Sequence, residues 1–431
     1  MLYDNLSVNG DGVLTVAGHN TAALAAEYGT PLMLLDADRV RNRCREYISA
    51  MAEFLPAGSM PFYASKALSF KALYALMQEE GMGVDVVSSG ELYTALAAGF
   101  PARKICFHGS SKTDGDIRYG MEQGVGVFVC DSLQELFAIE QEAAARNIRQ
   151  QVLLRLQPGI DPHTHQKIST GNIDCKFGVA IETGQAEAFV GQALSCSHVD
   201  LLGYHCHIGS QIFDHDPFCD AAVMMLRFCA AMEKQYGYRP RVLNLGGGMA
   251  VPYTKDAPSI SYRENIRSIG SLIASTCQIL GLTPPAIWME PGRSIVADAG
   301  VTLYSAVSTK TIPGFRNYVA VNGGMTDNPR YTLYQSPYTV VSAERMTEKA
   351  DFVCTVAGCC CESGDLIQEG VPLPEPKRGD LLAVLTTGAY NYSMASNYNR
   401  VPRPPIVMLE GGAHRLAVRR ETREDLTRYD V

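Results

Sequence analysis

Residues 60–67 read Met60-Pro61-Phe62-Tyr63-Ala64-Ser65-Lys66-Ala67, a short apolar run that ends at a lysine. Seven further runs of this kind follow before residue 291, at 83–87, 104–108, 126–130, 151–157, 199–206, 241–245 and 286–290. Between them, apolar residues recur at helical spacing over 90–98, 132–146, 217–236 and 262–280. Continuous apolar runs are typical of strands buried on both faces of a parallel sheet. Eight strand and helix repeats over about 230 residues predict a TIM barrel in an α/β protein.

The segment after residue 293 follows a different pattern. Helical periodicity fades there, and strand-like stretches occur at 301–310, 317–321, 338–342, 351–356 and 381–386. Clusters of proline and glycine at 370–374 and 402–405 separate them. We therefore expect three parts. They are an N-terminal segment, 1–35, that packs with the β domain through a strand; a barrel, 36–293; and a mostly β C-terminal domain, 294–431.

The bulk composition agrees with a large globular chain. It has 431 residues, of which 46% are hydrophobic and 19% charged, enough to bury the cores of two domains. The net charge of −8 gives no basic surface for nucleic acid, and acids interrupt the basic stretch 415–428, as on a solvated face. No stretch approaches the roughly 20 apolar residues of a membrane span, and residues 1–5 show no signal pattern. We expect a cytoplasmic protein without a membrane or nucleic acid partner.

Thirteen cysteines are spread along the chain without the paired spacing of a zinc site or a disulfide framework. We interpret most of them as buried thiols in a reducing compartment. The run Cys359-Cys360-Cys361 differs, because it is followed closely by Glu362 and Asp365. Adjacent cysteines do not easily chelate one metal together. A catalytic or an incidental role is therefore favoured over a structural metal.

Lys66 is the candidate for the central chemistry. A lysine at the end of a buried strand loses solvation, so its pKa falls and its neutral amine can form a Schiff base with an aldehyde cofactor. The opposite interpretation is a surface lysine whose charged end reaches solvent, which is the usual fate of this residue. The apolar flank and the strand-end position favour the first interpretation.

Two later segments suit the same ligand. Gly246, Gly247 and Gly248 can close backbone N–H groups around a phosphate, although a triple glycine alone is also typical of a flexible turn. Glu290 begins a Glu-Pro-Gly-Arg motif, and its carboxylate can hold a pyridine nitrogen protonated. An amine, a phosphate cradle and an acid for a ring nitrogen together predict pyridoxal phosphate.

These candidates fall on one rim of the predicted barrel. Barrel enzymes place their chemistry at the carboxyl ends of the strands and often bind phosphate after strands seven and eight. Lys66 follows the first predicted strand, Arg155 lies in the fifth and His207 follows the sixth. The triple glycine follows the seventh strand, and Glu290 ends the eighth. Residues chosen for their chemistry thus converge without having been chosen for position.

The histidines leave two alternatives open. In His205-Cys206-His207, strand alternation would send one imidazole into the core and the other outward, so that only one of them serves a ligand. The second alternative is a metal site that combines these residues with His163 and His165. No matching carboxylate cluster accompanies the histidines in the sequence, and we expect no metal.

Nine motifs match one known family as a set. They are YASKA at 63–67, DVVSSGE at 85–91, FHG at 107–109, HTH at 163–165, KFG at 176–178, HCHIGSQ at 205–211, the triple glycine at 246–248, EPGR at 290–293 and CESGD at 361–365. On these motifs, which span nearly the whole chain, it resembles the diaminopimelate decarboxylases, in the alanine-racemase-like class of pyridoxal phosphate enzymes. The resemblance implies a barrel, a C-terminal β domain and a homodimer with shared active sites.

The resemblance also implies roles for particular residues. Lys66 and His207 would act at the cofactor, and Cys361 would return a proton to the substrate carbon from across the dimer interface. The residues that would hold the cofactor are Lys66, Asp85, Arg155, His207, Ser210, Gly246, Gly247, Gly248, Glu290, Gly292, Arg293 and Tyr390. Those that would hold the substrate are Arg293, Arg330, Tyr334, Glu362 and Tyr390.

The activity implied by the resemblance is decarboxylation of meso-diaminopimelate to L-lysine and carbon dioxide. A glutamate at position 290 favours this reaction, since alanine racemases of the same class carry an arginine there. One alternative is a related decarboxylase of ornithine, arginine or carboxynorspermidine, which would want an acidic pocket in place of Arg330. Others are a non-catalytic decarboxylase-like binding protein and a metal-dependent hydrolase.

A few positions depart from the family pattern. Gln157 and Thr326 stand where asparagines are usual, and Ser110-Ser111 replaces a pair of asparagines before Lys112. Cys359 and Cys360 precede the expected proton donor and leave open which thiol faces the cofactor. The Glu-Ser-Gly-Asp that follows favours Cys361.

Overall fold

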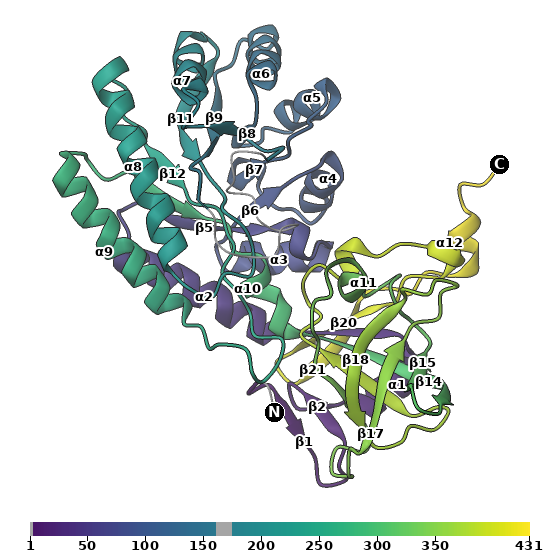
Figure 1. Ribbon diagram of the computed structural model, residues 1–431. Helices are drawn as coiled ribbons and strands as arrows, with labels where there is room; N and C mark the ends of the chain where they lie inside the picture. Colours follow the sequence, from purple (N-terminus) through teal and green to yellow (C-terminus); the bar gives the residue numbers. More distant parts are fainter. Residues whose placement is uncertain (1–2, 161–174) are drawn as a thin grey trace. The chain divides into compact units, whose positions relative to one another are not determined.

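The computed structural model describes residues 3–160 and 175–431 (Figure 1). The chain divides into two compact units. The barrel unit comprises residues 43–250 and 259–292, and the β unit comprises residues 1–42, 251–258 and 293–431. Among the helices in the described parts of the chain, none has both the length and the apolar character required to cross a membrane.

The barrel unit is built on eight parallel strands, each of which overlaps one of the eight predicted runs. They are β5 (Met60–Ala64), β6 (Gly83–Val86), β7 (Ile105–Phe107), β8 (Val127–Cys130), β9 (Gln150–Gln157), β11 (Val199–His205), β12 (Val242–Asn244) and β13 (Ala286–Met289). Their order is β9-β11-β12-β13-β5-β6-β7-β8, and β8 pairs again with β9, which closes the sheet. A short strand, β10 (Val179–Ala180), adds to the end of β9. The predicted TIM barrel is confirmed.

Helices surround these strands (Figure 1). They are α2 (Ala37–Phe54), α3 (Lys71–Glu79), α4 (Ser89–Ala97), α5 (Asp114–Glu122), α6 (Leu133–Ala145), α7 (Gln185–Ser195), α8 (Asp216–Tyr236) and α9 (Tyr262–Leu280). Ser88, Ser132 and Ser261 cap α4, α6 and α9, where each hydroxyl accepts a backbone N–H from the first turn. Such caps satisfy N–H groups that the first turn cannot, so these serines fix where the helices begin.

An apolar cluster ties the barrel strands together. Its buried members are Phe62, Cys106, Val127, Val129, Leu153, Leu202 and Val242. Trp288, the single tryptophan of the chain, packs against the cluster with its ring centroid 4.6 Å from that of Phe62. Burial of a large apolar side chain contributes about 1.5–3 kcal/mol. This packing fixes the strands, and with them the loops at their carboxyl ends.

The β unit contains two sheets. The smaller one is antiparallel and joins β1 (Leu6–Val8), β2 (Leu14–Val16) and β3 (His19–Asn20). The larger one runs β18-β17-β15-β14-β4-β20-β21, and β19 pairs with both β14 and β16. Its strands are β4 (Leu32–Asp36), β14 (Gly300–Ile312), β15 (Arg316–Val321), β16 (Val340–Ser342), β17 (Phe352–Ala357), β18 (Leu366–Leu373), β19 (Leu381–Leu385), β20 (Ile406–Glu410) and β21 (Ala413–Val418). The N-terminal strand β4 lies between β14 and β20, so the expected N-terminal contribution to this sheet is confirmed.

The helices of the β unit are short. They are α1 (Thr21–Tyr28), α10 (Arg293–Val296), α11 (Arg330–Tyr334) and α12 (Arg423–Thr427). The unit is therefore mostly β, as expected. Its core gathers buried side chains such as Leu34, Leu303, Ala383 and Val407 from the strands of the larger sheet.

Three strands of this sheet, β18, β20 and β21, were not predicted. The interpretation of 370–374 as a separating cluster was wrong, because 370–373 lie within β18. That strand is at the edge of the sheet, where a proline such as Pro372 is tolerated because it need not donate to a further strand. Strand β20 follows the 402–405 cluster directly, and β21 and α12 take up much of the basic stretch 415–428, whose side chains are exposed or half-buried.

Candidate active site

A cavity of about 490 Å³ opens among the carboxyl ends of the barrel strands. It brings together five of the predicted site residues: Lys66, Asp85, Arg155, His207 and Glu290. The other lining residues are Val87, Ser88, Phe107, His108, Gly109, Ser110, Ser111, Lys112, Asp116, Lys176, Phe177 and His205. In a parallel barrel all strands end at the same rim, which is why residues far apart in sequence meet here.

Lys66 lies in a single 3-10 turn, Ser65–Ala67, directly after β5. Its neighbours Ser65 and Ala67 are buried, whereas Lys66 is exposed and lines the cavity. The expected desolvation of this lysine was wrong, because the turn buries the flanking residues and leaves the amine on the open side. The N–H of Ala64 donates to the carbonyl of Pro291 at 3.1 Å, which ties this turn to the Glu-Pro-Gly-Arg motif.

Glu290 is buried, and nitrogen atoms of neighbouring side chains lie close to both of its carboxylate oxygens. Oε1 accepts a hydrogen bond from Asn244 Nδ2 at 2.6 Å and lies 2.8 Å from His108 Nε2, while Oε2 lies 3.2 Å from His205 Nε2. Burial alone would raise the pKa of Glu290, but the imidazoles of His108 and His205 outweigh it and hold that pKa well below its usual range. Asn244 also accepts the N–H of Gly246 at 2.9 Å, so one amide joins Glu290 to the triple glycine.

His205 and His207 both line the cavity. The alternative that strand alternation separates them was wrong, because β11 ends at His205 and His207 follows it, while the buried Cys206 between them is not one of the residues that line the cavity. Burial lowers the pKa of His205 to about 4, although Glu290 opposes this. Burial, and then the charges of Lys66 and Arg155, lower the pKa of His207 well below its usual value. Both imidazoles are therefore neutral at pH 7.

The histidines bear on the metal alternative. His163 and His165 lie outside the described residues. The histidines have one carboxylate beside them rather than a cluster, since His108, His205 and Glu290 offer ligand atoms within 4.8 Å of one another. Two imidazoles and a carboxylate also suit zinc. In the structure, however, both Nε2 atoms lie close to the Glu290 carboxylate, that of His205 in a hydrogen bond at 3.2 Å and that of His108 at 2.8 Å.

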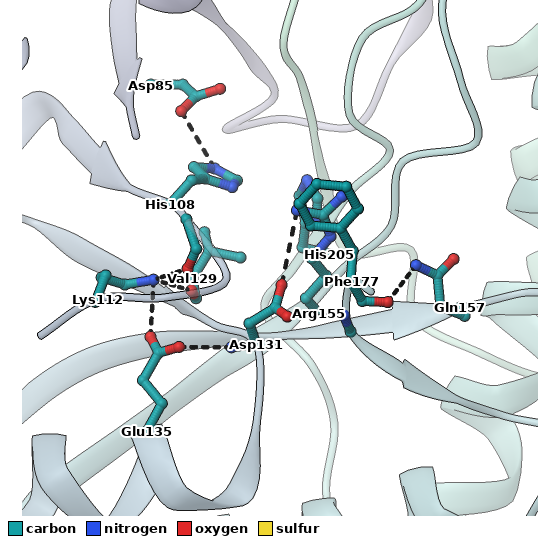
Figure 2. A network of polar contacts seen from close by, with 12 residues as sticks. Asp85, His108, Lys112, Val129, Asp131, Glu135, Arg155, Gln157, Phe177 and His205 are labelled. Atoms are coloured by element: carbon teal, nitrogen blue, oxygen red, sulfur yellow. Dashed lines mark hydrogen bonds and ion pairs between the residues drawn. The ribbon is translucent and has the colours of Figure 1, made fainter. Parts of the chain in front are cut away.

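Figure 2 shows Asp85 and Arg155 among the polar contacts around the cavity. Asp85 is buried with Oδ1 3.9 Å from His108 Nε2, and burial raises its pKa. Arg155 has Nη1 3.7 Å from Asp131 Oδ1, and its guanidinium carbon lies 4.3 Å from the ring centroid of Phe177. Arg155 is thus held on two sides while it faces the cavity.

The same network accounts for two positions near the departures from the family pattern (Figure 2). Lys112 Nζ lies 2.8 Å from Glu135 Oε1 and donates to the carbonyl of Val129 at 3.0 Å. Gln157 Nε2 donates to the carbonyl of Phe177 at 2.5 Å. These side chains support the cavity wall beside the positions that depart from the family pattern.

At the triple glycine, the backbone packs closely against the backbone of neighbouring segments. A Cβ built on Gly247 would lie 2.0 Å from the carbonyl oxygen of Glu290, and one on Gly248 would lie 2.4 Å from that of Gly209. A Cβ on Gly246 would lie 2.8 Å from His207 Nδ1, so this loop lies against a cavity residue. Only glycine fits at each of these places. The close packing explains why glycine stands at all three positions, and phosphate binding by this loop stays a prediction.

Two further predicted phosphate residues adjoin this loop. Ser210 stands in the segment after β11 that approaches the triple glycine, where Ile212 N–H donates to the carbonyl of Gly248 at 3.0 Å. Gly292 is packed so closely against β5 that its Cβ would lie 3.0 Å from that of Ala64. Both therefore lie on segments that frame the glycine loop.

The β unit holds the predicted arginines and tyrosines. Arg293 donates to the Tyr253 hydroxyl at 2.7 Å, and its guanidinium carbon lies 4.8 Å from the Tyr390 ring centroid. Arg330 donates to the Tyr338 hydroxyl at 3.1 Å, and its guanidinium carbon lies 5.0 Å from the Tyr253 ring centroid. Both arginines are only 5% exposed. Burial would raise the pKa of Tyr253, but these two guanidiniums outweigh it and lower that pKa. We call these five residues the arginine–tyrosine cluster.

Tyr334 ends α11, four residues after Arg330, and is half-buried. The cysteine loop, residues 359–365, lies in the same unit and is organised around the buried Asp365. Its carboxylate accepts the N–H groups of Met325 at 2.6 Å and Cys360 at 2.8 Å. Burial raises the pKa of the half-buried Cys360 to about 12, whereas Cys361 and the neighbouring Glu362 are exposed. The loop thus presents Cys361 on the surface of the unit.

His108, His205 and Asn244 were not predicted as site residues. Each belongs to a quoted motif or run, yet nothing in the sequence says that all three meet Glu290 from three different strands. The one available signal was position, since each lies at the carboxyl end of a predicted barrel strand.

Comparison with known proteins adds the family. The sequence pattern of the pyridoxal-dependent decarboxylases, pyridoxal binding domain, matches residues 37–297. The chain therefore belongs to the pyridoxal-dependent decarboxylases, and its cofactor is pyridoxal phosphate. The cavity fits that group, because the Lys66 amine and the buried Glu290 carboxylate both line it and the triple glycine lies at the same rim.

Relatives that match the full length of the chain are diaminopimelate decarboxylases. The chain is 45% identical over 432 residues to a diaminopimelate decarboxylase of Bacillus subtilis, covering 100% of this chain and 98% of the relative. It is 42% identical over 424 residues to that of Staphylococcus aureus, covering 98% and 99%. A solved diaminopimelate decarboxylase of M. jannaschii superposes with a TM-score of 0.91 at 33% identity, covering 99% of this chain and 98% of that one. The resemblance to the diaminopimelate decarboxylases is confirmed.

Proposed function

We propose that this chain decarboxylates meso-diaminopimelate to L-lysine and carbon dioxide. One observation carries the proposal: Lys66, His207 and Glu290 line one barrel cavity beside a glycine cradle, in a chain that is full-length similar to diaminopimelate decarboxylases. The relatives solved from M. jannaschii and Helicobacter pylori include complexes with L-lysine, which is the product proposed here.

Within the barrel, each residue has a defined task. Lys66 would bind the aldehyde of pyridoxal phosphate through its amine. The triple glycine, Ser210 and Gly292 would hold the phosphate. When bound, the cofactor supplies an electron sink for the pair left behind as carbon dioxide departs. Glu290 is ionised and therefore able to accept a proton-bearing ring nitrogen.

His207, Asp85 and Arg155 orient the cofactor. His207 is neutral, so it can lie against a ring without placing a positive charge beside it. Arg155 faces the cavity from β9 and is braced by Asp131 and Phe177. A braced cation keeps its direction when an anionic group binds, because little side-chain freedom remains to be lost.

Substrate selection depends on the far amino-acid head. A second carboxylate calls for a guanidinium, and a second ammonium calls for an acid. In the arginine–tyrosine cluster, the contacts of Arg330 within the described residues are to hydroxyls and rings, with no carboxylate paired to it. Arg293, Arg330, Tyr334 and Tyr390 would bind the substrate carboxylate, and Glu362 the ammonium. A substrate with a plain distal amine would leave a buried cation uncompensated.

Cys361 would return the proton. After carbon dioxide leaves, the α-carbon needs one proton, and a thiol that is protonated near neutral pH can give it from Sγ. Cys361 is exposed on a loop fixed by Asp365, a placement that suits action on the barrel of a second copy. The enzyme would therefore be a homodimer with shared sites. It would work in the cytoplasm, consistent with thirteen free cysteines.

The test is a substrate comparison. We expect purified protein with pyridoxal phosphate to release lysine from meso-diaminopimelate, and to turn over ornithine far more slowly. Activity should survive exhaustive chelation, which distinguishes it from a metal-dependent hydrolase. A clear preference for ornithine would reverse the substrate assignment. No turnover of either amino acid, and no near-visible chromophore, would favour a binding protein instead.

A further inference from the structure

We propose that His108 and His205 are positioning residues that clamp the Glu290 carboxylate from both oxygens and so hold it in place for the cofactor ring. The inference rests on the proposed cofactor site and goes beyond it, because it assigns the source of the geometry of Glu290. It also predicts that His205 acts through its Nε2–H group, and His108 through the polar approach of its Nε2 atom, rather than through ring packing alone.

The geometry supports a clamp. His205 Nε2 is hydrogen-bonded to Oε2 at 3.2 Å, and His108 Nε2 lies 2.8 Å from Oε1 as a close polar contact without hydrogen-bond geometry, so the two imidazoles approach different oxygens of one carboxylate. Asn244 Nδ2 reaches Oε1 at 2.6 Å. His205 and Glu290 are 1% and 6% exposed, which leaves little water to replace these contacts. A buried carboxylate that lost its donors would be driven toward the protonated form.

A neutral donor suits this task, and burial lowers the pKa of His205 to about 4, so that it is neutral at pH 7. A cation beside Glu290 would stabilise the carboxylate but would also repel a protonated ring nitrogen. A neutral imidazole stabilises the anion through its N–H without that repulsion. Asp85 lies 3.9 Å from His108 Nε2 on the cavity side, and the cations Lys66 and Arg155 also line the cavity.

Packing is the competing explanation. The rings of His108 and His205 meet edge to face, with centroids 4.8 Å apart and an interplanar angle of 71°. Such a contact would be kept by any ring of similar shape. A useful experiment must therefore remove the N–H and keep the ring, and separately keep an N–H and lose the ring.

The matched variants are His205→Phe, which keeps a ring, and His205→Gln, whose side-chain amide can place a donor near the position of Nε2. The measurement is the dissociation constant of pyridoxal phosphate for each apoprotein, by fluorescence titration, with far-UV circular dichroism to verify folding. We expect His205→Phe to bind at least about 10-fold more weakly, as loss of a hydrogen bond to a charged group implies, and His205→Gln to stay within about 3-fold. Turnover in His205→Phe should fall through kcat more than through KM.

Equal affinity of the two variants would overturn the proposal, whether both match the unaltered protein or both lose binding equally. His108→Phe and His108→Gln form a second pair with the same expectation. If a phenylalanine variant does not fold, nitrogen NMR of the histidines in the unaltered apoprotein decides. The proposal requires the neutral Nε2–H tautomer of His205, and the Nδ1–H tautomer or a cation at pH 7 would contradict it.

The outcome is separable from the proposed function. Borohydride reduction of the unaltered holoenzyme tests whether Lys66 carries the cofactor, irrespective of the histidines. An adduct at Lys66 together with equal cofactor binding by the two His205 variants would contradict the clamp and support the proposed function. A missing adduct would sink the function itself.

Discussion

Gly247→Ala is the sharpest perturbation that the structure offers at the glycine loop. Gly246 and Gly248 have φ values of 68° and 127°, in the region that favours glycine, whereas Gly247 is not among the residues with positive φ. Alanine at Gly247 therefore adds a methyl group without straining the backbone dihedral. Its whole effect comes from the contact with the carbonyl oxygen of Glu290.

The magnitude follows from that contact. The new Cβ would lie 2.0 Å from the oxygen, whereas non-bonded heavy atoms settle at about 3.5 Å, so the two segments must separate by roughly 1 Å or more. Overpacking of this kind costs about 1–3 kcal/mol of stability. Because the strand end that moves carries Glu290, we also expect turnover to fall by about 100-fold, the loss typical of a 1 Å misplacement.

The assay pairs urea unfolding of the apoprotein with titration of pyridoxal phosphate and steady-state turnover. Gly90→Ala is the control, since it makes the same chemical change at an exposed helical glycine, where the added Cβ would lie 3.7 Å from the Ser88 hydroxyl. It should be neutral or slightly stabilising. If Gly247→Ala bound the cofactor and turned over like Gly90→Ala, the close approach would have no functional meaning.

Three further predictions concern the proton donor, the substrate site and the buried histidine. Cys361→Ala should bind the cofactor but lose most turnover, while Cys359→Ala should keep its turnover. Mixing inactive Cys361→Ala with inactive Lys66→Ala should restore up to about a quarter of the activity through hybrid dimers. No recovery after verified subunit exchange would mean that both residues act within one chain. Arg330→Leu should raise KM for meso-diaminopimelate by about 10-fold or more without a matching loss on ornithine, and an equal effect on both substrates would argue against a carboxylate site. The pKa of His205 is about 4 in the folded protein and near 6.5 in the unfolded chain, so between these values the unfolded chain binds more protons. The unfolding free energy of the apoprotein should therefore fall by about 3 kcal/mol between pH 6.5 and 4 from this residue alone. Denaturant unfolding of His205→Gln should lack that part of the slope, and an unchanged slope would mean that His205 is not held neutral.

The barrel could be predicted from the sequence because its strands are buried on both faces. A run such as Met60–Ala64 is continuously apolar, and serine caps such as Ser88 mark where the next helix begins. These are local signals, and each remains readable without knowledge of the partner strand.

The β unit was predicted less completely, since its edge strands mix polar and apolar residues. Strand β18 contains Gly370 and Pro372, which locally indicate a turn, and only pairing with β17 makes this segment a strand. Tertiary context overrides propensity there. The exposure of Lys66 escaped prediction for a similar reason, because the 3-10 turn that exposes it depends on the packing of Ser65 and Ala67.

The site shows the same division. Lys66, His207 and Glu290 could be named from residue type and strand position. The clamp around Glu290 could not, because His108, His205 and Asn244 come from three strands and their meeting depends on barrel closure. The relation of His205 to His207 was also misjudged: β11 ends at His205, so strand alternation does not set the direction of His207, and both side chains line the cavity.

The most direct measurement is mass spectrometry of peptides from borohydride-reduced holoenzyme. The account predicts a single pyridoxyl adduct, on Lys66, whose formation is prevented when meso-diaminopimelate is added before reduction and restored when the substrate is removed. An adduct on any other lysine, or none at all in protein that decarboxylates meso-diaminopimelate, would contradict it.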